Sequence, residues 1–290
     1  LASGVNAAAF GANANASGRE SVAIGDNARA TNVDAIAMGD DAIASGFESM
    51  ALGDDASASG RGATAVGEDT NASGTRAAAL GANASATGRE SIAIGDNATA
   101  SNVDAIAMGD DAIASGFESM ALGDNASATA QGSLAAGTHS TASGIGGTAV
   151  GEHTYAGGWH STATGIDAYA GGSGSTAYGA GAIANNYGAV AVGEHTYAGG
   201  NHSTATGIDA YASGSGSTAY GAGAIAAADG AIAVGEGSMA TGSNSIAIGK
   251  NASATGSVAT GQYAYAENGG AAYGDYAYAG GYHNVAIGTD

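Results

Sequence analysis

The chain has no cysteine and no proline, and its 290 residues include only three phenylalanines and one tryptophan. The absence of cysteine excludes disulfides and cysteine-built metal or redox sites. So few large aromatic residues, beside 53 glycines, exclude a thick globular core. The composition therefore predicts a thin, repetitive structure that is held together by backbone pairing.

Basic residues are also scarce, because six Lys plus Arg stand against 26 Asp plus Glu and give a net charge of -20. Such a charge repels phosphate backbones and anionic lipid surfaces, which excludes nucleic acid as a partner. The sequence has no run of about 18 apolar residues. Leu1 begins within a repeat and not within a signal-like segment. We expect the chain to be a piece of a longer protein.

What the chain has in abundance is glycine at a fixed interval. A step of seven residues from Gly4 to Gly256 visits 37 positions, and 32 of them are glycine. The exceptions are Asn32, Asn102, Ala130, Asn186 and Ala228. Glycine adopts positive φ at little cost and asparagine tolerates it, so the interval predicts a turn every seven residues. Between Gly256 and Gly261 the interval falls to five, and we expect a bulge or loop there.

Alternate seven-residue units differ, so the true period is fourteen. Two short strands and two turns per period predict an all-β fold, a flattened parallel β-roll or solenoid. A heptad helix is excluded because each glycine would cost about 1 kcal/mol relative to alanine. With roughly 4.8 Å between coils, about twenty coils would extend on the order of 100 Å. We treat residues 1–290 as a single roll, with a tyrosine-free part, 1–144, and a tyrosine-rich part, 145–290.

Comparison of the coils within the chain predicts which side chains face inward. The positions of Val22 and Ile24 stay mostly bulky and lie two residues apart, so we assign both to the interior. They would pack against Ala28 and Ala30 of the opposite strand. The position of Ala23 is alanine in all eighteen coils from Ala9 to Ala247. We assign this position to the outside, where another copy of the chain would cover it at close range.

A specific motif recurs on this lattice. The pattern N-S-[VI]-A-I-G followed by x-x-A-x-A-x-G spans 244–256, with near-copies at 20–25 and 90–95. The motif resembles the head repeat of trimeric autotransporter adhesins, the YadA-like heads of Gram-negative bacteria with haemagglutinin-type repeats. The resemblance covers essentially the whole chain. The neck, the heptad stalk and the C-terminal membrane anchor of that family are missing, so we expect a head fragment.

The resemblance implies a left-handed β-roll, a homotrimer, and display on the bacterial outer membrane with the head exposed at the cell surface. It also implies adhesion, with a host cell or an extracellular matrix protein such as collagen as the partner. The near-match at Asn244 and Ser245 to the family's collagen-linked motif marks these two residues as candidate ligand contacts. The predicted trimer interface consists of Ala23, Ala37, Ala51, Ala93, Ala107, Ala121 and Ala247.

All thirteen tyrosines lie between Tyr155 and Tyr282. The position of Arg29 varies freely from coil to coil, so we expect it to face water. In the tyrosine-rich part the residues at this position form a stripe that we predict to contact a ligand, because tyrosine brings contact area and a hydrogen-bonding tip. The alternative is that tyrosine ladders only stabilise stacked strands. The candidate contacts of the stripe and of a neighbouring turn are Tyr155, Trp159, Tyr169, Tyr197 and Tyr211. Tyr178 and Tyr220 fall on the position that we assign to the core.

Acidic residues follow the turn glycine in ten coils. A stack of carboxylates at about 4.8 Å could hold calcium, but we favour a solvated acidic edge that blocks edge pairing. His139 and His153 are fourteen residues apart and would stack on adjacent coils, which leaves metal binding as a weak alternative. His153 with His160, and their copies His195 with His202, are seven residues apart, and duplication explains this recurrence equally well.

We predict neither enzyme activity nor a cofactor. Ser, His and Asp occur only at repeated positions, whereas an active site needs one pre-organised pocket. The function we predict is a non-catalytic adhesin head. A passive structural spacer and an ice-binding solenoid are the alternatives, and the second is disfavoured because the sequence lacks long regular threonine rows.

Overall fold

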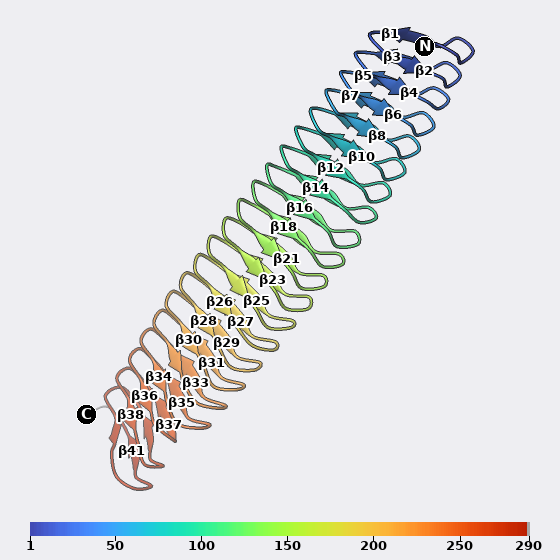
Figure 1. Cartoon of the computed structure of the whole chain (residues 1–290). Helices are drawn as coiled ribbons and strands as arrows, with labels where there is room; N and C mark the ends of the chain where they lie inside the picture. Colours follow the sequence, from blue (N-terminus) through green and yellow to red (C-terminus); the bar gives the residue numbers. More distant parts are fainter. Residues whose placement is uncertain (289–290) are drawn as a thin grey trace. The chain divides into compact units, whose positions relative to one another are not determined.

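A computed structural model describes residues 1–288 of the chain, which contain 41 short strands and no helix. Within these residues there is accordingly no helix that is long and apolar enough to cross a membrane. The chain divides into two compact units, Leu1–Gly146 and Gly147–Asp290. Within each unit every coil contributes a three-residue odd-numbered strand and a two-residue even-numbered strand (Figure 1). The predicted all-β solenoid of 14-residue coils is confirmed.

The first unit contains twenty strands. Its odd-numbered strands are β1 (Ala8–Phe10), β3 (Val22–Ile24), β5 (Ile36–Met38), β7 (Met50–Leu52), β9 (Thr64–Val66), β11 (Ala78–Leu80), β13 (Ile92–Ile94), β15 (Ile106–Met108), β17 (Met120–Leu122) and β19 (Leu134–Ala136). Its even-numbered strands are β2 (Asn15–Ala16), β4 (Arg29–Ala30), β6 (Ile43–Ala44), β8 (Ser57–Ala58), β10 (Asn71–Ala72), β12 (Ser85–Ala86), β14 (Thr99–Ala100), β16 (Ile113–Ala114), β18 (Ser127–Ala128) and β20 (Thr141–Ala142).

The second unit contains the other strands. Its odd-numbered strands are β21 (Thr148–Val150), β23 (Thr162–Thr164), β25 (Thr176–Tyr178), β27 (Val190–Val192), β29 (Thr204–Thr206), β31 (Thr218–Tyr220), β33 (Ile232–Val234), β35 (Ile246–Ile248), β37 (Val258–Thr260), β39 (Ala271–Tyr273) and β41 (Val285–Ile287). Its even-numbered strands are β22 (Tyr155–Ala156), β24 (Tyr169–Ala170), β26 (Ile183–Ala184), β28 (Tyr197–Ala198), β30 (Tyr211–Ala212), β32 (Ile225–Ala226), β34 (Met239–Ala240), β36 (Ser253–Ala254), β38 (Tyr265–Ala266) and β40 (Tyr278–Ala279).

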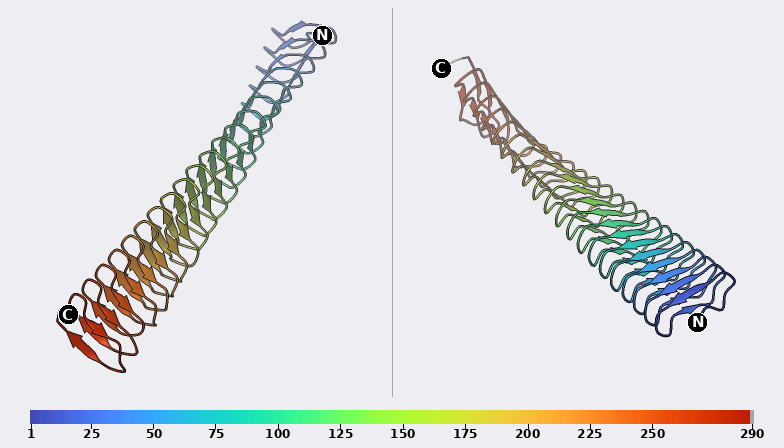
Figure 2. Two further views of the ribbon diagram at one scale, coloured as in Figure 1. Left: turned by 90° about the vertical axis from the view of Figure 1, so that its left-hand side faces the viewer. Right: turned by 90° about the horizontal axis from the view of Figure 1, so that it is seen from above.

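Strands of the same parity pair in parallel with those of the next coil, so residues fourteen apart lie opposite each other. Val22 pairs with Ile36, and Arg29 pairs with Ile43. The views in Figure 2 show the strands of successive coils side by side within each unit. Because only neighbouring coils pair, each sequence position forms a row of identical environments along the unit.

In the second unit the period shortens twice. Ile246 pairs with Val258, twelve residues on, and Val258 pairs with Ala271, thirteen residues on. Relative to a fourteen-residue coil, the missing residues come from the turns, and the strands on either side keep their register. The irregularity that the sequence predicts between Gly256 and Gly261 is therefore a shortened coil, not an inserted loop.

Alanine methyl groups fill the space between the two strands of each coil. Ala23, Ala28 and Ala30 have 0% exposed surface. Among the described residues, the largest fully buried side chains are threonines and serines. The inward orientation predicted for Ala28 and Ala30 is confirmed, and the interior is only as wide as these small side chains permit.

The orientation predicted for the odd-numbered strands is wrong, because inside and outside are exchanged. Val22 and Ile24 are half-buried on the outer face, and Ala23 between them is buried in the interior. The same holds for every residue of the predicted trimer interface, each with 0% exposure inside a single chain: Ala23, Ala37, Ala51, Ala93, Ala107, Ala121 and Ala247. A coil of fourteen residues brings its two sheets so close that only methyl groups fit between them. These alanines are therefore not available to another chain.

Most buried hydroxyl groups in the interior are satisfied locally, and those of Ser175, Ser217 and Ser257 are the exceptions. Ser21 Oγ donates a hydrogen bond to the carbonyl oxygen of Gly18 at 2.7 Å, and Thr70 Oγ1 donates to that of Gly67 at 2.9 Å. A buried hydroxyl without a partner destabilises a fold, so these bonds explain why serine and threonine are tolerated beside alanine.

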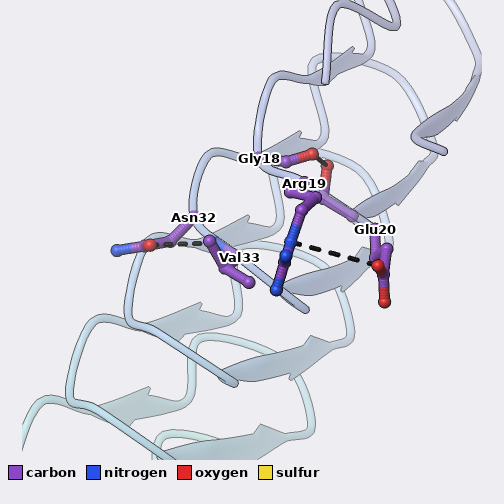
Figure 3. A network of polar contacts seen from close by, with 6 residues as sticks. Gly18, Arg19, Glu20, Asn32 and Val33 are labelled. Atoms are coloured by element: carbon purple, nitrogen blue, oxygen red, sulfur yellow. Dashed lines mark hydrogen bonds and ion pairs between the residues drawn. The ribbon is translucent and has the colours of Figure 1, made fainter. Parts of the chain in front are cut away.

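The two glycines of each coil serve different purposes. Gly25 has φ of 127°, a conformation that other residues rarely adopt. At Gly18 the constraint is space, because an added Cβ would lie 1.7 Å from the carbonyl oxygen of Asn32 in the next coil. Asn32 itself is held by side-chain hydrogen bonds, one of them from the N–H of Val33 to Asn32 Oδ1 at 2.8 Å (Figure 3). Asparagine thus replaces glycine here through hydrogen bonding and without a positive φ.

Candidate functional site

Seven successive even-numbered strands of the second unit present an outward row that we call the Tyr ladder. Its members are Tyr155, Tyr169, Ile183, Tyr197, Tyr211, Ile225 and Met239, one from each of β22 to β34. Register pairing places each member beside the next along the unit. The four predicted tyrosine contacts thus lie in one row on the outside of the roll, as the sequence predicts.

The tyrosines of the ladder stack in pairs. The ring centroids of Tyr155 and Tyr169 are 4.9 Å apart with an interplanar angle of 15°, and those of Tyr197 and Tyr211 are 4.9 Å apart at 14°. Tyr169 and Tyr211, each followed by an isoleucine, are the more open members of their pairs at 38% and 41% exposure. Aromatic pairs of this kind stabilise a sheet by about 0.5–1.5 kcal/mol beyond their area burial, so part of the ladder's role is structural.

A glycine two residues later fixes the orientation of the ring for three of the four ladder tyrosines, whereas Tyr211 is followed by Ser213 and is oriented by its stack on Tyr197. A Cβ added at Gly157 would lie 2.4 Å from Tyr155 Cε1, and one at Gly199 would lie 2.3 Å from Tyr197 Cε1. The ring therefore lies along its strand, over the place where a side chain would otherwise stand. In coils without tyrosine this position carries Ser, Thr, Asn or Ala, for example Ser143 and Ala227. The pattern Y-A-G is thus a unit that orients the ring, a signal present in the sequence that our sequence analysis missed.

The other predicted contacts lie on turns. Trp159 is 61% exposed on the turn that follows β22. Asn244 is exposed at φ of 56°. Ser245 is fully buried, and its Oγ accepts a hydrogen bond from the N–H of Gly242 at 3.2 Å. The structure thus corrects the assignment of Ser245 as a ligand contact, because its side chain faces the interior.

Two further tyrosines depart from their predicted place. Tyr178 and Tyr220 end β25 and β31 and are 59% exposed, so the prediction that they belong to the core is wrong. They lie on the outer face of the odd-numbered strands, for the same reason that Val22 and Ile24 do.

This outer face of the odd-numbered strands, which we call the odd-strand face, is apolar in the first unit. Met38 and Met108 are 41% and 42% exposed, and their neighbours in register are mostly aliphatic. Its aliphatic members include Val22, Ile24, Ile36, Met38, Met50, Leu52, Ile92, Ile94, Ile106, Met108, Met120 and Leu122. Thr64 and Ala78 lie in register between Met50 and Ile92, and the aliphatic residues continue on either side of them. Exposed apolar surfaces of this extent are typical of interaction sites. In the second unit the first residues of β21, β23 and β25 on this face are threonines, Thr148, Thr162 and Thr176, which pair in register. Val190 of β27 ends this row of threonines.

A second tyrosine cluster lies toward the C-terminal end of the second unit. Tyr265 stacks on Tyr278 with centroids 5.1 Å apart. Tyr265 Oη donates a hydrogen bond to Glu267 Oε2 at 2.6 Å. This hydrogen bond to a carboxylate raises the pKa of the Tyr265 hydroxyl above its usual value, since the bond stabilises the protonated form.

The acidic row that follows the turn glycines is bonded to the backbone. Asp26 Oδ1 accepts a hydrogen bond from the N–H of Ala12 at 2.9 Å, and Asp40 Oδ1 accepts one from the N–H of Asp26 at 3.0 Å. Asp96 and Asp110 repeat the contact. Each of these aspartates therefore accepts a hydrogen bond from an amide of the preceding coil. Neither the calcium hypothesis nor the hypothesis of a solvated acidic edge includes this role.

Replacing Asp40 separates these roles. We expect Asp40→Ala to lower the free energy of unfolding by about 1 kcal/mol, because the N–H of Asp26 loses its acceptor. The matched variant Asp40→Asn keeps an acceptor and removes one charge from a like-charged row, so we expect its stability to equal or exceed that of the wild type at low salt. Thermal unfolding measures both. An Asp40→Asn protein as unstable as Asp40→Ala, with wild-type stability raised by calcium, would contradict this role.

Two of the turn histidines lie beside carboxylates. His153 Nδ1 is 3.7 Å from Glu152 Oε1 and 3.8 Å from Asp167 Oδ1, and His195 Nδ1 is 3.8 Å from Asp209 Oδ1. His153, His160, His195 and His202 have φ between 50° and 54°. Over residues 1–288 no three His, Cys, Asp or Glu side chains gather closely enough to hold a metal ion.

Basic residues form exposed ion pairs in the turns. Arg19 Nε lies 3.9 Å from Glu20 Oε1 (Figure 3), and Arg76 Nη1 lies 3.1 Å from Glu90 Oε1. Exposed pairs contribute about 0–1 kcal/mol at most. These arginines therefore place charge at the surface and add little to the stability of the roll.

Comparison with known proteins identifies the repeat. The family model described as the YadA head domain repeat matches ten segments that together cover more than half of the chain. The matched residues are 2–28, 30–56, 44–67, 58–84, 86–112, 114–140, 128–154, 184–207, 198–224 and 226–252.

Among solved structures, the crystal structure of the collagen-binding domain of the Yersinia adhesin YadA is similar to this chain at 24% sequence identity. The likeness covers 60% of this chain and 68% of that chain, with a TM-score of 0.22. No curated protein matches the chain.

Proposed function

Because the chain belongs to the family of YadA head domain repeats, we propose that it is the head of a bacterial surface adhesin that acts without catalysis. The head is displayed from the outer membrane and attaches the cell to host matrix or to host cells. The observation that carries this proposal is the Tyr ladder, an outward row of oriented aromatic side chains on a repeat of the adhesin type. Repetition of weak contacts along such a row raises the overall affinity through avidity.

We further propose that three chains assemble through the odd-strand face. The aliphatic row of the first unit, from Val22 to Leu122, is a larger apolar surface than a soluble monomer usually exposes. A closed arrangement of identical chains removes such a surface from water on every copy. The family resemblance favours a trimer. Light scattering on the purified chain tests it, and a mass near three times 27.0 kDa is the expected result.

The ligand class that the family resemblance implies is a matrix protein such as collagen. Immobilised collagen, laminin and fibronectin are the surfaces for the test, and we expect saturable binding of the folded chain to at least one of them. The fourfold variant Tyr155→Ser, Tyr169→Ser, Tyr197→Ser, Tyr211→Ser is expected to lose most of that binding, because it removes the aromatic contact area of the ladder.

A matched control changes the same kind of outward position in the other unit. Ile43 and Ile113 are outward residues of β6 and β16 with 37% and 43% exposure. The double variant Ile43→Ser, Ile113→Ser is expected to bind as the wild type does. Binding to none of the three proteins would favour the passive spacer, and full binding by the fourfold tyrosine variant would remove the contact role from the ladder.

A further inference from the structure

A polar groove runs across the first coils of the first unit, on the outer face of the even-numbered strands. It lies between the turn residues that precede β2, β4, β6 and β8 and the outward residues of β2, β4 and β6. Its volume is about 590 Å³, and small-molecule sites usually have about 300–1,000 Å³. The turn side is lined by Asn13, Asn27, Asp41 and Asp55, and the strand side by Asn15, Arg29 and Ile43.

Backbone bonds between coils hold the turn side of the groove in place. All four of its residues have φ between 54° and 57°. The N–H of Asn27 donates a hydrogen bond to the carbonyl oxygen of Ala12 at 2.8 Å, and the N–H of Asp41 donates to that of Asp26 at 2.8 Å. Asn13 Nδ2 donates to Asn27 Oδ1 at 3.3 Å. A ligand therefore meets a row of side chains on an ordered backbone, which lowers the entropic cost of binding.

Several polar groups of the groove are free to bind a ligand. Within the described residues, the side chains of Arg29, Asp41 and Asp55 form no ion pair or hydrogen bond, although they line the same groove. Asn15 Oδ1 is shielded from solvent and has no hydrogen-bond partner. Buried polar atoms normally have one, and a ligand hydroxyl beside Asn15 would supply it once the amide rotates.

The charges of the groove select a neutral ligand that is rich in hydroxyl groups. Arg29 pairs in register with Asn15 on one side and with Ile43 on the other, so its cation lies in the middle of the strand side. That position repels a cationic ligand, and the facing carboxylates together with a net charge of -20 repel an anionic one. A hydroxyl group can donate to a carboxylate and accept from a guanidinium. Hydrogen bonds with a charged partner are the stronger kind.

We propose that this groove binds a neutral hexose residue of a glycan. The Arg29 guanidinium presents several N–H donors in a planar fork, which suits two adjacent hydroxyl oxygens. Asp41 and Asp55 accept from hydroxyl groups on the opposite side of the sugar. Ile43 is 37% exposed and offers apolar surface to the C–H groups of the ring. This contact is separate from the Tyr ladder, which belongs to the second unit.

The chain contains a near-copy of this region that serves as an internal comparison. Residues 18–54 recur at 88–124 with three differences, which are Val22 to Ile92, Arg29 to Thr99 and Thr31 to Ser101. Only the exchange of Arg29 for Thr99 changes a charge. Because the copy forms the same strand with threonine at this position, we expect the variant Arg29→Thr to fold normally.

Binding of simple sugars to the full chain tests the proposal. Methyl glycosides of galactose, glucose and mannose are suitable probes, because their anomeric oxygen is blocked as it is in a glycan. Saturation-transfer NMR is expected to show binding of at least one of them with a Kd on the order of 1 mM. The corresponding uronic acid and amino sugar are expected to bind more weakly. Failure of all three neutral glycosides to bind, or tighter binding of a charged sugar, would overturn the proposal.

Two matched arginine variants locate the site. Arg29→Thr is expected to weaken sugar binding at least about tenfold, because hydrogen bonds from a charged donor are lost. Arg19→Thr removes the same charge from a turn of the same unit, where Arg19 lies beside Glu20, and is expected to bind the sugar as the wild type does. Circular dichroism checks the fold of both. Equal sugar affinity of Arg29→Thr and the wild type would show that the groove is not the site.

The sugar site and the matrix contact can fail separately. Arg29→Thr is expected to bind the matrix proteins as the wild type does, because that contact is assigned to the Tyr ladder. The fourfold tyrosine variant is expected to bind the methyl glycosides as the wild type does. Loss of sugar binding in the fourfold tyrosine variant would place the sugar at the ladder and contradict the groove.

Discussion

Replacing Ala93 by leucine is expected to destabilise the roll by about 3 kcal/mol or more, among the largest effects of any single substitution in the first unit. Ala93 has 0% exposure and pairs in register with Ala79 and Ala107, so its methyl group lies in a row of methyl groups. Three additional carbon atoms cannot enter this space without moving the two sheets apart, and overpacking of a tight interior costs about 1–3 kcal/mol or more. Chemical unfolding followed by circular dichroism measures the loss.

The matched control is Thr99→Leu, on the outward position of β14 in the next even-numbered strand. The variant adds apolar volume on the outside, so we expect the free energy of unfolding to change by less than about 0.5 kcal/mol. If the two variants were equally stable, or if Thr99→Leu were the more damaging, then the interior would not be the alanine layer of this structure.

The orientation of the odd-numbered strands shows why the sequence could not assign the interior unaided. A period of two separates Val22 and Ile24 from Ala23, but it does not say which set faces inward. We assumed that bulky side chains fill the core, which holds for a sheet packed at the usual 10 Å or so. Ala30 is invariant on the opposite strand, the position of Ala28 carries only Ala, Ser or Thr, and Ala23 is invariant as well. Two facing layers restricted to small side chains indicate one narrow interior, and that signal was present in the sequence.

The sequence predicts where the turns lie, but it does not predict which backbone conformation or contact each turn requires. Glycine every seventh residue predicts the coil, but the reason at Gly25 is its φ of 127° and the reason at Gly18 is the carbonyl of the next coil. Likewise the acidic row was visible in the sequence, whereas the hydrogen bond from the N–H of Asp26 to Asp40 requires the register of two coils. Contacts between coils depend on how closely the coils approach each other in space, and the spacing of residues along the sequence does not give that distance.

The Tyr ladder was the part of the candidate site that the sequence located best. The fourteen-residue phase places Tyr155, Tyr169, Tyr197 and Tyr211 in one outward row, and the structure has them there. The direction of the rings of Tyr155, Tyr169 and Tyr197 was not predictable from that phase, because it depends on the glycine two residues later. Once the ring lies over Gly157 or Gly199, it stacks on the tyrosine of the next coil, and a uniform stripe becomes two stacked pairs.

Lysine at the centre of the odd-strand face is expected to abolish assembly. The double variant Ile94→Lys, Met108→Lys places two cations in the apolar row. The two residues are neighbours that pair in register. Burial of an unpaired cation in an apolar interface costs several kcal/mol, and closed symmetry would bring three copies of each charge toward the same axis. We expect light scattering to give a folded monomer of 27.0 kDa where the wild type gives three times that mass.

The control places the same charge on the other outward face. Ser85 and Thr99 are outward residues of β12 and β14 and pair in register, so Ser85→Lys, Thr99→Lys adds two lysines at the same spacing without touching the odd-strand face. This variant is expected to keep the trimeric mass, because long cationic side chains on a solvated surface are readily hydrated. Loss of assembly in the control, with assembly kept in the Ile94 and Met108 variant, would move the interface to the even-numbered strands. The even-numbered strands of the second unit carry the Tyr ladder at the equivalent outward positions, so the ladder would then compete with assembly as the role of this face.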